Sequence, residues 1–435
     1  MKLYNSLFGR KESFEPIDGK TVRVYVCGMT LQDSPHLGHL RVFTVFDTLY
    51  RLFKILGWEV KTVQNFTDID DKIIKKSEEE GTDWRVLTER YEVEYREIAK
   101  RMNFLPVHHP RATQHIQEII EMIERIVERG YAYVKDGNVW FSVRRFLKDY
   151  EYGVLSKMPL DELRAGARVE VDPSKEDPLD FALWKARKEG EPYWESPWGK
   201  GRPGWHIECS AMSSTHLGLP FDIHGGGKDL IFPHHENEIA QTKGATGKDF
   251  ARFWVHVGLL TISGEKMSKS LRNYFLAKEA LSNFHPSAIR LLLLSAHYRN
   301  DLEFYPEKLN EFSRSWSRLY EKLSNVRGET VKSLWDELLE ILKDDLDTPE
   351  FFAQVFKNLE SDDKNVLYTL REILEKLGFS FEREMEDVVL RRLIELRNIA
   401  RREKNYELAD KIREVLKLVG VELMDTPEGT KFRIG

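Results

Sequence analysis

The fold class follows from one stretch near the N-terminus, TVRVYVCGMTLQDSPHLGH at residues 21–39. Residues 21–27 are apolar enough to form a buried strand, and the loop after them leads into a helix whose apolar residues recur every three or four positions until Gly57. A second apolar run, residues 60–66, predicts the next strand. Strand, glycine-bearing loop, helix and strand in this order are typical of a doubly wound parallel sheet, whose ligands bind beyond the carboxyl ends of the strands.

The sequence pattern changes several times along the chain. Residues 113–200 contain a helix, a hairpin-like segment and a polar stretch, and they interrupt the α/β pattern. Beyond residue 305 the apolar residues keep helical spacing. We therefore predict an α/β fold: a doubly wound, Rossmann-type parallel-sheet domain with an inserted connective domain, followed by a C-terminal helical bundle. The predicted regions are 1–112 (first half of the sheet domain), 113–200 (connective insertion), 201–305 (second half), 306–385 (helical bundle) and 386–435 (basic C-terminal region).

Composition sets the broad class. The chain has 435 residues, 41% of them hydrophobic and 32% charged, with a net charge of −6, which is ordinary for a multidomain globular protein. The mild acidity excludes wholesale coating of nucleic acid but allows a local basic face. Two distant cysteines make no disulfide framework, and neither a signal peptide nor a membrane-spanning run is evident. We expect a cytoplasmic protein without a membrane partner.

Each of the two cysteines lies next to a motif that contains histidine. Cys27 closes the first strand just before the histidine-rich loop, and Cys209 follows GWHIE at residues 204–208. A third cluster, PHHENE at residues 233–238, adds imidazole and carboxylate groups. Thiolate, imidazole and carboxylate together suit Zn²⁺, so the three motifs predict a metal site.

The histidine-rich motif is His36-Leu37-Gly38-His39. It lies between a predicted strand and a helix N-terminus, where backbone N–H groups and the helix dipole attract phosphate. The two imidazoles can donate hydrogen bonds to a nucleotide's phosphates, and Gly38 lets a flat base approach the backbone. The alternative is a pair of surface histidines that cap the helix.

A lysine-rich loop, KMSKS, occupies residues 266–270 behind ISGE. Lys266 and Lys269 can bring ammonium groups onto a polyphosphate and stabilise the charge that develops on departing pyrophosphate. The alternative is a solvated basic loop. The histidine motif upstream makes the phosphate-binding interpretation the favoured one.

Together these motifs resemble the class I aminoacyl-tRNA synthetases, with Leu37 in place of the isoleucine of the His-Ile-Gly-His signature. More narrowly, the chain is similar to the cysteinyl-tRNA synthetase family. The similar segments are residues 65–74, 196–212, 222–238 and 400–430. The sequence departs from the family pattern at residues 29–32, at Arg272 after the lysine loop, and in a short helical region near 330–390.

The resemblance implies specific ligands. It assigns one zinc ion per chain to Cys27, Cys209, His234 and Glu238. In a helix that begins near Pro233, residues 234 and 238 lie one turn apart on a shared face, which agrees with this assignment, whereas His235 and Glu236 should point elsewhere. The non-metal alternative makes His234 and Glu238 a surface pair and both cysteines small core residues.

The resemblance also implies an activity: ATP-dependent ligation of L-cysteine to its cognate tRNA through cysteinyl-adenylate, with Mg²⁺ accompanying ATP. Zinc would select the substrate thiol, because a shape-based pocket separates cysteine from serine only weakly. His36, His39, Lys266 and Lys269 are the predicted catalytic groups and, with Gly38 and Asp229, bind ATP. By family resemblance, Thr67, Trp205 and His224 line the amino-acid pocket.

The tRNA partner rests on the C-terminal residues. A basic run through residues 391–417 predicts either phosphate contacts or a solvated helix face laced with glutamates. The resemblance favours an anticodon-binding region, and it places a stem-contact region within residues 201–305. We expect a monomer. Two other functions stay open: a ligase that joins activated cysteine to an amino sugar on the same catalytic core, as in mycothiol biosynthesis, and a non-catalytic metal- or RNA-binding relic.

Overall fold

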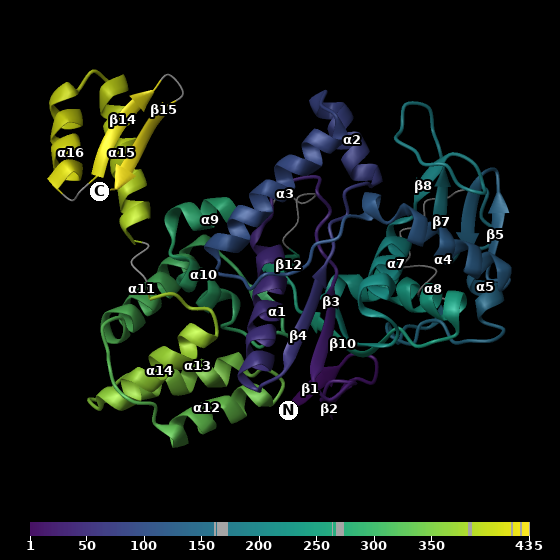
Figure 1. Cartoon of the computed structure of the whole chain (residues 1–435), viewed down its shortest axis with the longest axis horizontal. Helices are drawn as coiled ribbons and strands as arrows, with labels where there is room; N and C mark the ends of the chain where they lie inside the picture. The colour runs from purple at the N-terminus through teal and green to yellow at the C-terminus, as the bar shows by residue number, and fades with distance from the viewer. Residues whose placement is uncertain are drawn as a thin grey trace.

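A parallel sheet forms the centre of the protein (Figure 1). The computed structural model describes residues 1–160, 162, 173–262, 264–266, 274–381, 385–418, 421–426 and 429–434. The sheet has the strand order β10-β9-β3-β4, and every neighbouring pair is parallel. Its strands are β3 (Thr21–Val26), β4 (Glu59–Gln64), β9 (Phe221–Gly227) and β10 (Ala251–Val257). The predicted doubly wound α/β fold is confirmed, and both strands expected from the first segment are present.

Successive side chains of β3 point to opposite faces of the sheet, and a different helix covers each face. Val24 and Val26 pack against α1 (Leu37–Ile55), whereas Tyr25 and Cys27 face the other side, where α7 (Trp205–Leu217) lies. The helix after β3 covers one face, and α8 (Glu236–Thr246), which follows β9, packs on α7 over the other. Strands β3 and β9 are therefore the point where the winding direction reverses, the usual ligand-binding crevice of such sheets.

An antiparallel unit is inserted between β4 and α7, at the right of Figure 1. Its four strands pair in the order β5-β6-β7-β8, and helix α4 packs on both α7 and α8. The strands reach Pro203, so they cross the predicted boundary at residue 200; the division into regions stays a prediction. The helices and strands between β4 and α7 are α2 (Asp71–Glu80), α3 (Trp84–Arg101), η1 (Ala112–Gln114), α4 (Ile116–Glu128), β5 (Ala132–Lys135), β6 (Asn138–Phe141), α5 (Val143–Phe146), β7 (Phe181–Ala186) and β8 (Gly201–Pro203).

Short elements cover the edges of the sheet. The N-terminal hairpin lies along β10, where the Ser6 N–H donates to the Trp254 carbonyl at 2.9 Å. After β10, a small sheet of order β12-β11-β13 and two helices lead toward the C-terminal half. These elements are β1 (Lys2–Asn5), β2 (Arg10–Ser13), η2 (Lys228–Leu230), the π turn η3 (Ile231–His235), β11 (Leu260–Ile262), β12 (Glu265–Lys266), α9 (Ala277–Asn283), α10 (Pro286–Leu293) and β13 (Leu302–Glu303).

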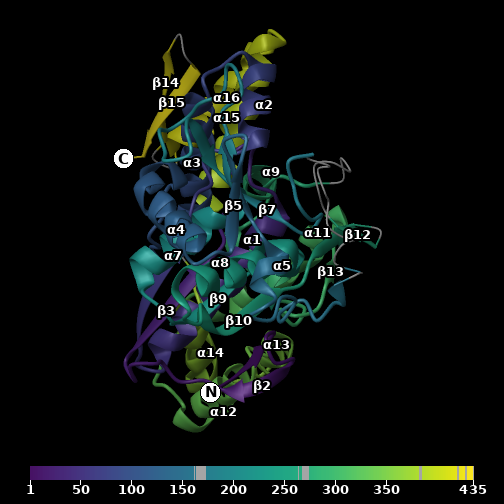
Figure 2. The same ribbon diagram turned by 90° about the vertical axis from the view of Figure 1, so that its right-hand side faces the viewer.

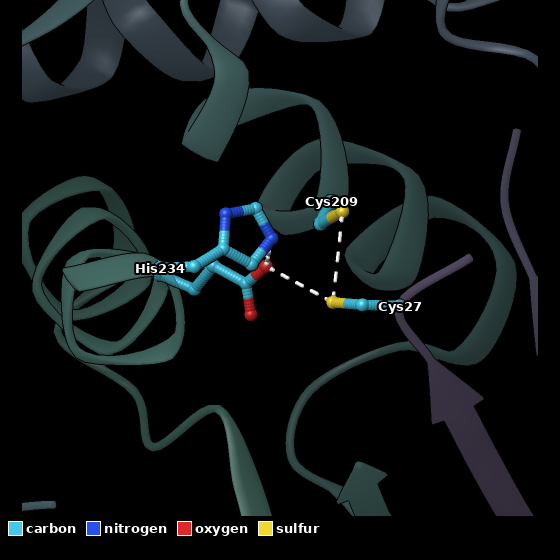
Figure 3. Close-up of side chains that lie close together, drawn as sticks. Cys27, Cys209 and His234 are labelled. Carbon is cyan, nitrogen blue, oxygen red and sulfur yellow. Dashed lines mark hydrogen bonds and ion pairs between the residues drawn. The ribbon is translucent and has the colours of Figure 1, made fainter. Parts of the chain in front are cut away.

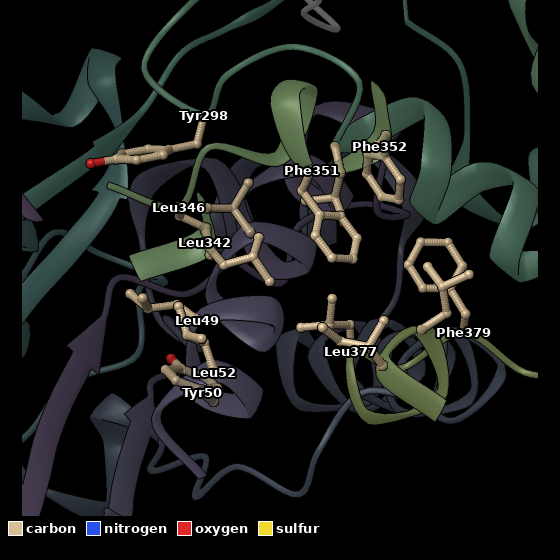
Figure 4. Close-up of a cluster of buried hydrophobic side chains, with 14 of the residues drawn as sticks. Leu49, Tyr50, Leu52, Tyr298, Leu342, Leu346, Phe351, Phe352, Leu377 and Phe379 are labelled. Atoms are coloured by element: carbon tan, nitrogen blue, oxygen red, sulfur yellow. The ribbon is translucent and has the colours of Figure 1, made fainter. Parts of the chain in front are cut away.

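The helical bundle expected after residue 305 packs directly on the sheet domain. Leu49 and Leu52 of α1 share one core with Leu342, Phe351 and other buried residues of the bundle (Figure 4). The two parts therefore bury a continuous apolar surface, which is the main source of stability at such a contact. The bundle helices are α11 (Pro306–Leu323), α12 (Lys332–Lys343), α13 (Thr348–Asn358) and α14 (Lys364–Lys376).

The last residues form a small α+β unit, which lies across the view from the insertion in Figure 1 and at the top of the molecule in Figure 2. Helices α15 (Met385–Arg402) and α16 (Tyr406–Leu418) pack together, and the antiparallel strands β14 (Val421–Thr426) and β15 (Gly429–Ile434) follow. The sequence did not predict this hairpin. Among the described residues, no helix is both long and apolar enough to cross a membrane.

One buried ion pair joins the sheet domain to the helices that follow it. Arg290 of α10 lies 2.7 Å from the Asp47 carboxylate of α1, and both side chains are almost fully buried. The same guanidinium donates to the Met102 carbonyl at 2.9 Å and to the Leu377 carbonyl at 3.2 Å, at the end of α14. A single arginine thus connects three segments that are distant in sequence.

We expect Arg290→Met to lower the free energy of unfolding by about 2 kcal/mol, because it removes one of the two arginines that pair with the buried Asp47 carboxylate, the other being Arg51 at 2.9 Å, and leaves two backbone carbonyls without this donor. Lys54→Met is the matched control: Lys54 is exposed on the same helix as Asp47, and its replacement should change stability by less than about 0.5 kcal/mol. Urea denaturation followed by circular dichroism measures both. Equal midpoints for the two variants would contradict the role given to Arg290.

Candidate active site

Four side chains from distant segments converge at the carboxyl end of β3 (Figure 3). The sulfur atoms of Cys27 and Cys209 are 3.9 Å apart, and Cys27 Sγ lies 3.6 Å from Glu238 Oε1. His234 Nε2 lies 2.8 Å from the same carboxylate oxygen. One potential ligand atom from each residue falls within 4.8 Å of all the others, and all four residues are buried. The structure thus brings together the four predicted metal ligands; their role as ligands stays a prediction.

Local backbone geometry makes this convergence possible. His234 lies in the π turn η3, in which Phe232 is extended, and Glu238 follows in the first turn of α8. The two side chains therefore share a face, as their spacing of four predicts. Cys209 lies on α7, which packs against α8, and Cys27 directly follows β3. Each group is thus fixed by an element of the central scaffold.

The cluster has unusual proton affinities because it is closed to water. Burial raises the pKa of Cys27 well above its usual range, whereas a hydrogen bond from the Cys27 thiol lowers the pKa of Cys209 to about 7. Burial disfavours the His234 imidazolium, but the Glu238 carboxylate and the Cys209 sulfur together outweigh burial and raise the pKa of His234 to about 10. A cation bound at His234 Nε2 would replace the proton that this ring shares with Glu238.

These donors fit a divalent transition-metal ion. Two sulfurs, one imidazole nitrogen and one carboxylate oxygen form the mixed soft and borderline set that suits Zn²⁺. His234 Nδ1 lies 2.8 Å from His206 Nδ1, so the face of the ring away from the cluster has the outer hydrogen-bond partner that metal-bound histidines commonly have. Glu238 Oε2 is buried and lies beside the His224 ring, so both carboxylate oxygens face an imidazole nitrogen.

The expectation that His235 points away from this site is wrong. His235 Nε2 lies 3.3 Å from Cys27 Sγ, and His224 Nε2 lies 2.7 Å from Glu238 Oε2. Cys27, His224, His235 and Glu238 therefore form a second group with metal-ligand spacing that overlaps the first. Regular α-helical geometry suggested otherwise, but residue 235 ends a π turn, so two consecutive histidines face the cluster from different sides.

Glu236 points away from the cluster, as expected. Its carboxylate accepts hydrogen bonds from the backbone N–H groups of Gly153 at 3.0 Å and of Leu155 and Ser156 at 2.9 Å. Glu236 therefore anchors the insertion to the first turn of α8.

The histidine motif begins α1. His36 is the N-cap: its Nδ1 accepts from the Gly38 N–H at 3.1 Å, and the His36 N–H donates to His39 Nδ1 at 3.3 Å. The two rings stack with their centroids 3.8 Å apart. Because Nδ1 of each ring accepts, the proton of each neutral imidazole is on Nε2.

Glycine at position 38 has a structural reason that the sequence did not reveal. A Cβ atom there would lie 2.9 Å from Cε1 and Nδ1 of the His36 ring, closer than real Cβ atoms approach other atoms. The ring folds over the helix start only because this residue has no side chain.

The lysine loop lies only partly within the described residues. The Lys266 backbone pairs with Thr261 in the small antiparallel ladder of β11 and β12, whereas Lys269 lies outside the described part of the chain. The segment that follows docks on the histidine motif: the Leu37 N–H donates to Phe275 O at 3.0 Å, and the Ala277 N–H donates to Pro35 O at 2.9 Å. Residues 275–277, which follow the lysine loop in the sequence, are therefore joined to the histidine motif by backbone hydrogen bonds.

Comparison with known proteins decides the family. The domain described as "tRNA synthetases class I (C) catalytic domain" matches residues 13–314. A cysteine–tRNA ligase of Aquifex aeolicus is 44% identical over 491 residues and covers all of this chain and 99% of the relative. This chain belongs to the cysteine–tRNA ligase family. A ligase of Thermotoga maritima is 43% identical over 462 residues, with both chains fully covered.

Solved structures agree on the fold of this member of the cysteine–tRNA ligase family. A Mycobacterium tuberculosis methionyl-tRNA synthetase in complex with methionyl-adenylate aligns with a TM-score of 0.59 and 16% identity, covering 82% of this chain and 89% of that one. At that identity the likeness shows the fold alone.

The predicted amino-acid-pocket residues differ in burial and in their contacts with the four-residue cluster. The Trp205 ring is 37% exposed and lies 4.3 Å from the His234 ring, centroid to centroid. Thr67 is buried beside Met29, and His224 is fully buried, stacked on Tyr25. Only Trp205 combines contact with the cluster and exposure to solvent. The roles of all three stay predictions.

Asp229 lies in the short helix η2, directly after β9, and is exposed. Its Oδ1 atom would be 2.5 Å from a Cβ atom at Gly227, so the glycine leaves room for this carboxylate at the strand end. Its role with ATP stays a prediction.

The C-terminal basic run is not a uniform surface. Arg397 is buried and makes two contacts of 2.7 Å with the Asp425 carboxylate, and Arg401 pairs with the same group. Lys411 pairs with Glu407 on the same helix. Arg397 therefore holds the β14–β15 hairpin onto α15, a role that the sequence analysis did not foresee.

The site makes a prediction about metal content. We expect the purified chain to bind one divalent transition-metal ion, and Cys209→Ser to weaken this binding by about ten-fold or more, because it removes a thiolate. Chelator competition measures the dissociation constant. Ser214→Ala is the control, since Ser214 lies on the same helix and its hydroxyl donates only to the Ser210 carbonyl. Equal affinity in both variants would exclude Cys209 as a ligand.

Proposed function

We propose that this protein is an ATP-dependent cysteine–tRNA ligase that joins L-cysteine to tRNA(Cys) through cysteinyl-adenylate. The observation that carries the proposal is full-length similarity, at 42–45% identity, to proteins named cysteine–tRNA ligase. The buried cluster of two cysteines, a histidine and a glutamate supports it, because such a cluster suits a substrate whose distinguishing atom is sulfur.

Zn²⁺ is the proposed metal, held by Cys27, Cys209, His234 and Glu238. When bound, it supplies a soft acceptor for the thiolate of the substrate, which the hydroxyl of serine, with its far higher pKa, cannot match. A pocket that relied on shape would separate two near-isosteres by only about 10–200-fold. Burial of the four ligands keeps water from competing for the site.

In the first proposed step, the cysteine carboxylate attacks the α-phosphorus of ATP, which enters with Mg²⁺, and pyrophosphate leaves. His36 and His39 present Nε2–H groups at the start of α1, where the helix dipole also favours phosphate. We assign Lys266 and Lys269 to the charge on the departing pyrophosphate and Asp229 to the ribose hydroxyls. The docking of residues 275–277 on the histidine motif supports joint action on one nucleotide.

In the second proposed step, a ribose hydroxyl at the 3′ end of the tRNA attacks the mixed anhydride and releases AMP. No protein nucleophile takes part, so catalysis consists of alignment and charge stabilisation. Trp205 flanks the cluster at the surface and is our candidate for covering the substrate side chain, with Thr67 and His224 behind it.

The tRNA-binding part of the proposal concerns the C-terminal unit. Arg392 and Arg402 are exposed on α15, where Arg392 also pairs with Glu395, and Lys404 follows the helix. Arg397, in contrast, is buried against Asp425. We therefore assign anticodon-side phosphate contacts to the exposed cations alone. The protein is proposed to act as a monomer in the cytoplasm.

The proposed function predicts cysteine-dependent ATP–pyrophosphate exchange, with serine at least about 10³-fold less active, beyond what shape alone provides. Radioactive pyrophosphate exchange with each amino acid measures this ratio. Aminoacylation of a tRNA(Cys) transcript, compared with an amino-sugar acceptor, tests the second step. Transfer to the amino sugar alone would identify the other ligase class, and exchange in neither case would exclude the enzyme.

Gly38→Ala tests the role given to the His36 ring. Alanine is the better helix former by about 0.5–1 kcal/mol, but the displaced His36 ring gives up its N-cap hydrogen bond, which costs about 1 kcal/mol, so thermal stability should change little. The added Cβ must displace the His36 ring, so the exchange rate should fall by about ten-fold or more. In a His36→Ala background the same change should have little further effect, since the ring it displaces is gone. Independent, additive losses would show that glycine acts in another way.

A further inference from the structure

A chain of three hydrogen bonds runs from the N-terminal segment to the sulfur of Cys27. Ser6 Oγ lies 2.8 Å from His256 Nδ1, His256 Nε2 lies 2.8 Å from His235 Nδ1, and His235 Nε2 lies 3.3 Å from Cys27 Sγ. His235 is fully buried and His256 is 6% exposed, while Ser6 is part-buried. None of the steps proposed above uses Ser6, His235 or His256.

A metal-bound thiolate fixes which atom donates and which accepts in each of these three hydrogen bonds. A thiolate offers only lone pairs, so His235 must present Nε2–H to Cys27. A neutral ring has one N–H, so His235 Nδ1 then accepts from His256 Nε2–H, and His256 Nδ1 accepts from the Ser6 hydroxyl. Burial lowers the pKa of His256 to about 3, which keeps that ring neutral. The serine hydroxyl can donate or accept, so it can begin the chain.

The direction matters because two ligand groups compete for one ion. Cys27 and Glu238 belong to both groups; Cys209 and His234 complete one, and His224 and His235 complete the other. His235 can join the second group only through an Nε2 lone pair. In the tautomer that donates to Cys27 this lone pair is replaced by a proton, and the second group loses a ligand.

We propose that Ser6 and His256 hold His235 in its Nε2–H tautomer, so that His235 supports the Cys27 sulfur as a donor and is kept out of the coordination sphere. His235 and His256 are then positioning residues that direct the metal to the two-thiolate group. This inference rests on the metal assignment in the proposed function.

Backbone contacts hold the residues of this hydrogen-bond series in place. The Ser6 N–H is hydrogen-bonded to the carbonyl of Trp254 on β10, two residues before His256, so donor and acceptor are fixed by one strand. His235 ends the π turn that also carries His234. Outer partners of this kind orient metal ligands and typically change metal affinity by about 10–100-fold when they are removed.

The test uses the full chain loaded with Co²⁺, whose near-ultraviolet sulfur-to-cobalt absorption scales with the number of thiolate ligands. His256→Leu removes the donor to His235 and allows the other tautomer. We expect it to lose about half of this absorption, as one thiolate of two leaves the sphere, and to bind Co²⁺ about ten-fold more weakly by chelator competition. His256→Gln keeps an amide N–H in the place of Nε2–H and should retain the two-thiolate spectrum.

Two further variants keep the test decisive if His256→Leu fails to fold. Ser6→Ala, at a part-buried position, removes the first donor and should shift the spectrum in the same direction as His256→Leu. Adding His235→Leu to His256→Leu deletes the competing ligand and should restore the two-thiolate absorption.

Unchanged absorption and affinity in both Ser6→Ala and His256→Leu would overturn the proposal, as would equal losses in His256→Leu and His256→Gln. A parent protein without two-thiolate absorption would overturn the metal assignment as well. Because these spectra need neither amino acid nor tRNA, they separate failure of this inference from failure of the proposed activity.

Discussion

The structure around the site depends on one electrostatic constraint: Glu238 is buried against two sulfur atoms and no lysine or arginine side chain of the described residues pairs with it. A buried carboxylate is costly unless a cation or proton compensates it. His224 and His234 provide that compensation by holding the pKa of Glu238 well below its usual range, although burial opposes this effect. The same need for positive charge makes the cluster receptive to a divalent ion.

The sheet explains why these groups meet. Cys27 follows β3, whereas the segment that carries His234 and Glu238 follows β9 on the neighbouring strand. The helices after these two strands cover opposite faces, so a crevice opens between them. The histidine motif begins the helix after β3, and residues 275–277 are hydrogen-bonded to it. The predicted metal ligands and the histidine motif therefore share one sheet edge, although they come from residues 27 to 238.

Sequence reasoning worked where local geometry is regular. Strand β3, helix α1 and the i,i+4 pair of His234 and Glu238 all follow from periodicity. It failed where the backbone departs from regular geometry or where contacts are long-range. The π turn places His235 at the cluster, and the proximity of His256 to His235 depends on how β10 packs, which no spacing reveals.

The structure of the C-terminal region also depends on contacts between residues that are distant in the sequence, so the sequence pattern did not predict it. Arg397 reads as one cation among many in the sequence, yet it is buried against Asp425 of the hairpin. The hairpin itself is polar and short, so its strands carry a weak alternation signal. The reason for glycine at position 38 is likewise a contact with the His36 ring, which motif recognition alone does not supply.

The anchoring of residues 153–156 by Glu236 has a consequence for how this architecture can change. Glu236 lies between His235 and Glu238, and three amide groups of the insertion satisfy its charge. Deleting the insertion would strand an anion within one turn of Glu238, at a helix start that already bears several buried ionisable groups. The inserted unit is therefore not a detachable accessory: the chemical core and its appendage are interdependent, and truncation toward a minimal enzyme would have to redesign position 236 first.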